Sequence, residues 1–183
     1  GQTHTYDDEG VYRVQALAYD WANNQVSDDY VVRVDKTAPD LKITSPSPNY
    51  KIRATTELRA DSDDSWPGGV PVMDGEGPST PDIGWFEICS LESTTCAADD
   101  AAAWQRINQP GGANACTAPD GEGGGTPLTP NSSGVATDYS CRFDPIDYPA
   151  GSYMLRFVGR DVAGNEARSP AIPVRLQSEF CPL

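Results

Sequence analysis

The sequence has little positive charge. It contains 13 lysines and arginines against 27 aspartates and glutamates, which gives a formal net charge of −14. Proteins that bind nucleic acid need a basic surface against the phosphates, and docking on anionic lipid also relies on positive charge. We therefore expect no nucleic-acid partner and no anionic membrane surface. The charge suits a solvated surface, or one that collects cations.

Histidine and long apolar runs are also scarce. The one histidine, His4, lies ahead of the first predicted strand, where a solvated side chain is expected. No apolar run is long enough to cross a bilayer, so we expect no membrane insertion. The sequence has no Gly-x-Ser-x-Gly elbow and no phosphate loop, and nothing in it brings two carboxylates to one cleft. We expect no enzymatic activity.

None of the five cysteines has the Cys-x-x-Cys spacing of a zinc or redox site. They are Cys89, Cys96, Cys116, Cys141 and Cys181. Disulfides of an exported protein are favoured over free thiols buried in a cytosolic one. Four cysteines allow three pairings, and the sequence does not select one. Cys181 either stays free or bridges to something outside the chain, and we expect any export signal to lie upstream of Gly1.

One motif occurs twice, 141 positions apart. Gly10-Val11-Tyr12 leads to Asp20-Trp21-Ala22-Asn23-Asn24, and Gly151-Ser152-Tyr153 leads at the same spacing to Asp161-Val162-Ala163-Gly164-Asn165. Five positions are identical, and apolar residues alternate between them. Such a repeat indicates that one supersecondary unit is used twice. Each copy predicts two strands joined by a tight turn.

Alternating apolar residues predict many short strands and little helix, which is typical of an all-β sandwich. Residues 61–82 and 109–131 are rich in Gly, Pro and Asp and predict long loop insertions. A short helix is expected within residues 97–107, and Pro173 predicts that the last strand lies at a sheet edge. The expected divisions are a terminal hairpin of an incomplete sandwich (1–35), a linker (36–40), a complete sandwich (41–177) and a tail (178–183).

The repeat resembles the bacterial immunoglobulin-like domains found in tandem in secreted and cell-surface proteins. In sandwiches of this type a tyrosine hydrogen-bonds back to the corner before its strand, and Tyr12 and Tyr153 occupy that position. The connector Val34-Asp35-Lys36-Thr37-Ala38-Pro39 is similar to the family's boundary between repeats. Trp85-Phe86-Glu87-Ile88-Cys89-Ser90-Leu91 is similar to its aromatic-Glu-Cys-Ser-Leu strand, with Ile88 added. The resemblance implies an immunoglobulin-like sandwich and a Cys89–Cys116 disulfide, since Cys116-Thr117-Ala118-Pro119 is similar to the context of the family's second cysteine. Cys96 and Cys141 are additional to the family's pattern, and we expect them to be disulfide-bonded as well.

Acidic residues gather where we expect the linker, the second strand of the sandwich and the repeated turn to meet. The candidate ligands are Asp40, Asp61, Asp63, Asp64 and Asp161. Calcium takes six to eight oxygen ligands, so a Ca²⁺ site that stiffens the junction is one hypothesis. The alternative is that the acidic loops are solvated and that Asp161 only caps its turn.

Trp66, in a predicted loop, and Trp104, in the insertion, are candidate platforms for a sugar or protein ligand. The alternative is that each covers the core or a disulfide, which is the reading favoured for Trp85. The leading function is a non-catalytic extracellular structural or adhesive module of a bacterial surface protein or filament. The alternative is an accessory carbohydrate- or protein-binding domain of a secreted enzyme.

The first copy of the motif lacks the rest of its sandwich. A lone hairpin is at best marginally stable in water, and the expected face of Tyr12, Val14, Ala16 and Ala18 is apolar. We therefore expect neighbouring repeats or another subunit to complete it by strand complementation. The alternative is that residues 1–35 add strands to the complete domain.

Overall fold

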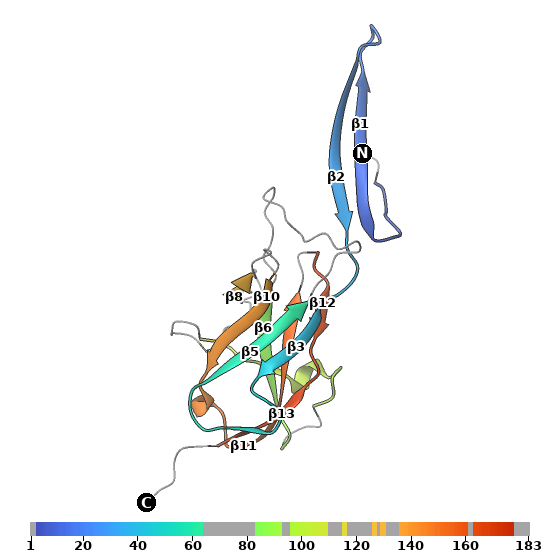
Figure 1. Ribbon diagram of the computed structural model, residues 1–183. Coiled ribbons are helices and arrows are strands. Elements are labelled where there is room, and N and C mark those ends of the chain that lie inside the picture. The colour runs from blue at the N-terminus through green and yellow to red at the C-terminus, as the bar shows by residue number, and fades with distance from the viewer. Residues whose placement is uncertain are drawn as a thin grey trace, which may run out of the picture.

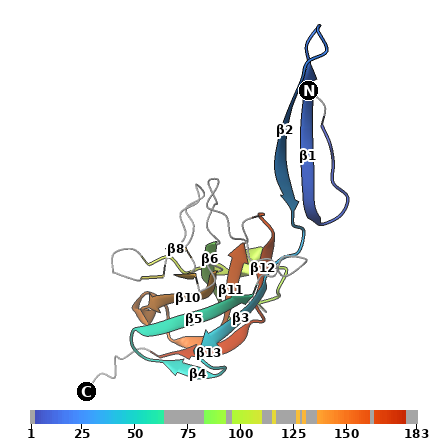
Figure 2. The same cartoon turned by 45° about the horizontal axis from the view of Figure 1, so that its top comes forward.

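The structure is all-β and has two parts, a long hairpin and a β-sandwich. The computed structural model describes residues 3–63, 83–92, 96–109, 115–116, 126–127, 129–130, 136–160 and 163–177. The hairpin projects from one end of the sandwich (Figures 1 and 2). Within the described residues its two strands pair only with each other, so they do not extend the sheets of the sandwich.

The hairpin consists of β1 (Gly10–Tyr19) and β2 (Gln25–Val34), which confirms both predicted strands. Its antiparallel register runs without a break from Gly10 opposite Val34 to Tyr19 opposite Gln25. Asp20 closes the turn, because its carboxylate accepts hydrogen bonds from the amides of Ala22 (2.9 Å) and Asn24 (2.8 Å) and from Asn24 Nδ2 (2.7 Å). Bonds from Asn24 lower the pKa of Asp20 below its ordinary value.

The first sheet of the sandwich has the order β3-β5-β10-β9. Its strands are β3 (Asp40–Ser45), β5 (Thr56–Asp63), β10 (Ala136–Phe143) and β9 (Thr129–Pro130). Side chains alternate along β5, with Leu58 and Ala60 buried and Glu57 and Arg59 exposed. The sheet therefore buries one face and solvates the other.

The second sheet has the order β4-β13-β11-β6-β7, with β12 also paired to β11 and β8 to β6. Its strands are β4 (Tyr50–Ile52), β13 (Ile172–Leu176), β11 (Gly151–Arg160), β6 (Ile83–Ser90), β7 (Gln105–Arg106), β12 (Glu166–Arg168) and β8 (Thr126–Pro127). The prediction that β13 lies at the edge is wrong, since residues 174–176 pair in parallel with β4. Pro173 is tolerated because this pairing begins one residue later, while its carbonyl accepts a bond from the Asn49 amide at 2.6 Å.

The core lies between the two sheets. The rings of Phe86 and Phe157 from the second sheet meet Tyr139 from the first, with centroids 5.1–5.7 Å apart. Gly84 makes room for them, because a Cβ there would lie 2.2 Å from Cζ of Phe157. This is the dense packing of a folded interior.

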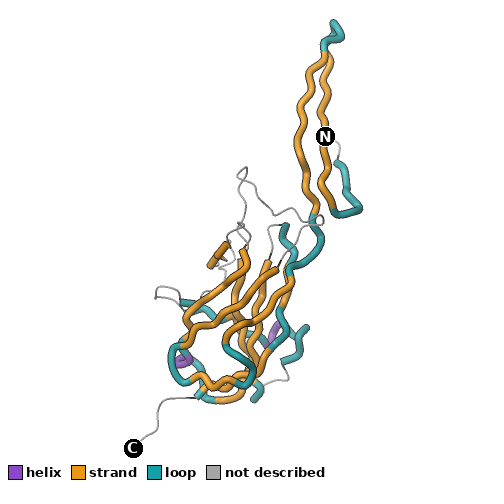
Figure 3. The backbone as a smooth tube through the Cα atoms, viewed as in Figure 1, coloured by secondary structure: helices purple, strands orange, loops and turns teal. Residues whose placement is uncertain are grey.

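Among the described residues, helix is limited to two short 3₁₀ turns (Figure 3), Ala101–Ala103 and Pro145–Asp147. The helix expected within residues 97–107 is therefore wrong, apart from the single 3₁₀ turn at Ala101–Ala103. Trp104 is extended (φ −100°, ψ 124°), and the chain continues as β7 along β6, where the Ile107 amide donates to the Phe86 carbonyl at 2.9 Å. Pairing with an available sheet edge overrides a weak local helix preference.

Candidate functional site

The hairpin presents two different faces. Directly opposed residues of an antiparallel pair lie on the same face, so the register sorts the side chains. The face that we call the even face carries Tyr12, Val14, Ala16, Ala18, Val26, Asp28, Tyr30 and Val32. The opposite, odd face is more polar and includes an ion pair between Arg13 Nη2 and Asp29 Oδ2 at 2.6 Å. The even face is therefore the one that favours burial.

The even face is half-covered at one end and open at the other. Near the sandwich, the ring of Tyr6 packs 4.4 Å from that of Tyr12, and His4 packs edge-on against Tyr6 at 4.6 Å. Farther out, Val26 is 65% exposed and Tyr30 is 58% exposed. The outer half of this face has no such cover in the described chain, and its exposed apolar side chains make it the candidate interaction surface of the hairpin.

The predicted tyrosine corner is present in both copies. Tyr12 Oη donates to the carbonyl of Asp8 at 2.8 Å, and Tyr153 Oη donates to that of Pro149 at 2.9 Å, each four residues back. Burial, followed by the charge of Glu92, raises the pKa of Tyr153 above its ordinary value. The two copies therefore share the hydrogen bond that ties the first strand to the residue four positions before the tyrosine.

Polar contacts tie the hairpin to the sandwich. Asn165, in the turn of the second copy, donates from Nδ2 to the carbonyls of Asp35 (3.3 Å) and Thr37 (3.2 Å). The Glu9 carboxylate accepts bonds from the Lys36 amide and from Thr37 Oγ1, both at 2.7 Å. Lys36 Nζ donates to the carbonyls of Tyr6 (3.1 Å) and Asp7 (2.6 Å), which precede β1. The linker is therefore held from both sides.

The proposed calcium ligands are only partly within the described chain. The β3–β5 register sets Asp40 opposite Asp63 and Asp61 opposite Lys42, whereas Asp64 and Asp161 lie outside the described residues. In the described ranges, no three His, Cys, Asp or Glu side chains group so that they could hold a metal ion. The calcium site stays a prediction.

The prediction that Trp104 is an exposed ligand platform is wrong. Its side chain is buried, with 7% exposure. Its indole Nε1 donates to the Ala97 carbonyl at 2.9 Å, and the guanidinium of Arg156 lies 4.0 Å from the ring centroid. Trp104 covers an arginine on the outer face of β11 through a cation–π contact. Trp66 lies outside the described residues.

A buried ionic cluster on that outer face was missed by sequence reasoning. Glu87 Oε2 accepts from Arg156 Nε at 2.7 Å and lies 2.6 Å from Nη2, while Oε1 accepts from Trp85 Nε1 at 3.0 Å. Arg156 Nη1 also donates to the Ala98 carbonyl at 2.8 Å. The cluster holds the 96–104 segment onto the sheet. The available signal was the alternation of Trp85, Glu87 and Cys89 on one face of a strand.

The disulfides join Cys89 to Cys96 and Cys116 to Cys141. The Cys89–Cys116 pairing implied by the family resemblance is therefore wrong. Ile88 gives the physical reason, because one added residue in a strand moves the following side chain to the other face. Cys89 lies on the same face as Glu87, away from the core, whereas Cys116 and Cys141 belong to the core cluster.

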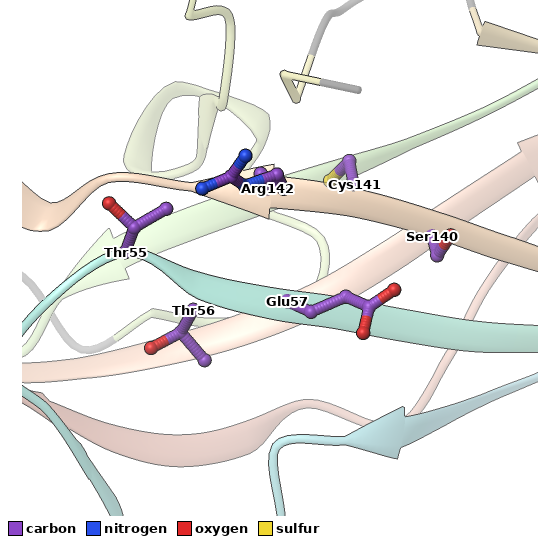
Figure 4. Close-up of a pocket in the computed structure, with 6 residues that line it drawn as sticks. All are labelled: Thr55, Thr56, Glu57, Ser140, Cys141 and Arg142. Carbon is purple, nitrogen blue, oxygen red and sulfur yellow. The ribbon is translucent and has the colours of Figure 1, made fainter. Parts of the chain in front are cut away.

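A hollow of about 370 Å³ lies across β5 and β10 (Figure 4). It is lined by Thr55, Thr56, Glu57, Ser140, Cys141 and Arg142. The Glu57 carboxylate is 2.9 Å from the guanidinium of Arg59, and Cys141 is bonded to Cys116. The hollow sits at the end of β5 far from the junction, so it is not part of the hairpin surface.

No family model and no curated protein matches the sequence. Among solved structures, the chain is similar to dimeric latent PorU from Porphyromonas gingivalis, with 17% sequence identity and a TM-score of 0.40. The match covers 94% of this chain and 13% of the PorU chain, so the chain spans a small part of that protein's length. In the described parts of the chain, we find no helix long and apolar enough to span a bilayer.

Proposed function

We propose that this chain is a non-catalytic extracellular module of a bacterial surface protein or filament, with a structural or adhesive role. In this proposal the sandwich is a disulfide-stapled spacer. The hairpin joins it to a neighbouring module or subunit, whose strands complete the hairpin.

The observation that carries the proposal is the relation between the two copies of the motif. Both form a hairpin behind a tyrosine corner, but β11 and β13 are built into a sheet while β1 and β2 pair only with each other among the described residues. Two disulfides add support, because they persist in oxidising compartments such as the cell exterior. The hydrogen bonds that hold the linker suit a module that sets the direction of its neighbour.

Immunogold labelling of cells that naturally make the protein tests the location and the role together. We expect antibodies against the sandwich to label intact cells along an ordered surface structure. Mass spectrometry of the native protein should find Cys89, Cys96, Cys116 and Cys141 oxidised. Labelling that requires lysis, together with four reduced thiols, would overturn the proposal.

A further inference from the structure

The backbone of β1 has a defined outer edge, on the side away from β2. In the complete copy, the Ser152 carbonyl accepts a hydrogen bond from the amide of Leu91, the residue that follows β6. The backbone N–H and C=O groups of even-numbered β11 residues therefore point toward β6. In the hairpin, the Asp20 amide donates to the Asn24 carbonyl. The backbone N–H and C=O groups of even-numbered β1 residues therefore point toward β2. Since strand residues alternate, the backbone groups of Arg13, Gln15 and Leu17 point outward.

The complete copy indicates what belongs on that edge. β6 runs antiparallel along the whole of β11, from Ser90 opposite Tyr153 to Ile83 opposite Arg160. The other edge of its hairpin is used at three residues only, where β4 pairs with β13. Because the tyrosine corners set β1 in the place of β11, a long neighbour, which the hairpin does not have among the described strands, belongs beside β1 rather than beside β2.

Side-chain size indicates what the neighbour brings to the even face. Ala16 stands where Phe157 stands in the second copy, at the same spacing from the corner tyrosine. Phe157 is fully buried, and its ring lies 5.1 Å from Phe86 and 5.2 Å from Tyr139. An alanine at this position leaves that volume to be filled from the other side, since protein interiors pack densely.

Charge argues against a second copy of the chain as the neighbour. Between residues 3 and 35 there are seven carboxylates and two arginines, and the whole chain carries −14. Asp28 lies on the even face itself, opposite Ala16. Two such faces brought together would set like charges in an apolar interface, which is unfavourable. A neighbour with a basic side chain near Asp28 is favoured.

We propose that the outer edge of β1 binds an antiparallel strand of a partner β-sandwich. The partner presents bulky apolar side chains to the even face and a basic side chain to Asp28. This inference rests on the proposed function and adds the edge, the direction and the chemistry of the partner. Main-chain hydrogen bonds supply much of the affinity in strand addition of this kind.

The test uses the full chain with a strand tethered ahead of Gly1. The strand is a copy of Ile83–Ser90 carrying Cys89→Ser, joined by about twelve Gly/Ser residues, which reach roughly 20 Å and give millimolar effective concentration. The control carries Glu87→Pro in the copy, because proline removes a ladder donor. Amide exchange is followed by NMR in ¹⁵N-labelled protein. The unextended chain is measured as the reference for the extended chain and for its proline control.

The β6 register transferred to β1 sets the copied Cys89, Glu87 and Trp85 positions opposite Arg13, Gln15 and Leu17. We expect the amides of these three β1 residues to exchange about tenfold or more slowly in the extended chain, and no slowing in the proline control. Slowing along the outer edge of β2 instead, or no slowing at all, would overturn the inference. So would slowing in the unextended chain that grows with protein concentration, which would identify a second copy as the occupant.

The failure of this inference is distinguishable from failure of the proposed function. The inward-facing amides of Tyr12 and Val14 in the unextended chain report whether the hairpin is stable alone. If they exchange as slowly as the core strands, the hairpin needs no completing strand and the proposed function fails. If they exchange fast and the tethered strand has no effect, only the assignment of the β1 edge fails.

Discussion

Replacing Glu87 by glutamine removes one charge from the buried cluster on β6 and β11 and leaves the other in place. The side chains of Arg156 and Glu87 are 4% and 10% exposed, and the closest N–O distance between them is 2.6 Å. Glutamine has nearly the same shape, so packing is preserved while the guanidinium loses its counter-charge. Breaking a buried pair in this way costs about 3–5 kcal/mol. At the lower end this lowers the Tm by roughly 6–12 °C for a chain of this size.

Urea unfolding followed by tryptophan fluorescence measures this effect. Glu57→Gln is the matched control, because Glu57 pairs with Arg59 at 2.9 Å on an exposed surface, where a pair is worth about 1 kcal/mol or less. The double variant Glu87→Met/Arg156→Met should be more stable than Glu87→Gln, since apolar replacement of a whole buried pair is often neutral. If Glu87→Gln changes stability no more than Glu57→Gln does, the cluster does not hold the outer segment.

Three further changes test other parts of the structure. Tyr153→Phe should destabilise the sandwich by about 1 kcal/mol, the net value of one hydrogen bond. Tyr12→Phe should leave the urea midpoint of the sandwich unchanged. Equal effects of the two substitutions would contradict separate roles for the two corners. Replacing Cys116 and Cys141 by alanine should cost about 3.5 kcal/mol of unfolding free energy, and replacing Cys89 and Cys96 about 2.5 kcal/mol. The difference arises because the sequence separations of the two disulfides are 25 and 7. The reverse order in urea denaturation would refute this entropic account. Asn165→Ala should lower ¹⁵N order parameters across residues 10–34 by loosening the linker, and unchanged values would show that this side chain does not restrain the junction.

Local patterns in the sequence predicted the strands of both hairpins and the apolar composition of the even face. Alternation and turn residues determine these features within ten residues of chain, as at Val14 and Asp20. Partners that meet across a sheet were not predictable in this way. Trp104 is buried because Arg156, about fifty residues later, faces it from β11, and no local pattern records that contact.

The two clearest errors in prediction have different causes, strand phase for one and a very short partner strand for the other. The family resemblance paired Cys89 with Cys116, but Ile88 turns Cys89 to the outer face, where Cys96 meets it. The sequence also predicted β13 at an edge because of Pro173, although β4 pairs with the residues after it. β4 has three residues, too few for an alternating pattern to be seen.

The most direct test of the central claim is amide exchange at matched positions of the two copies in the unextended 183-residue chain. The account predicts that Tyr12 and Val14 exchange about 100-fold or more faster than Tyr153 and Leu155, because no described strand outside the hairpin buries its even face. The same protection at Tyr12 as at Tyr153, and at Val14 as at Leu155, would contradict it, since the hairpin would then be stable without strands from elsewhere.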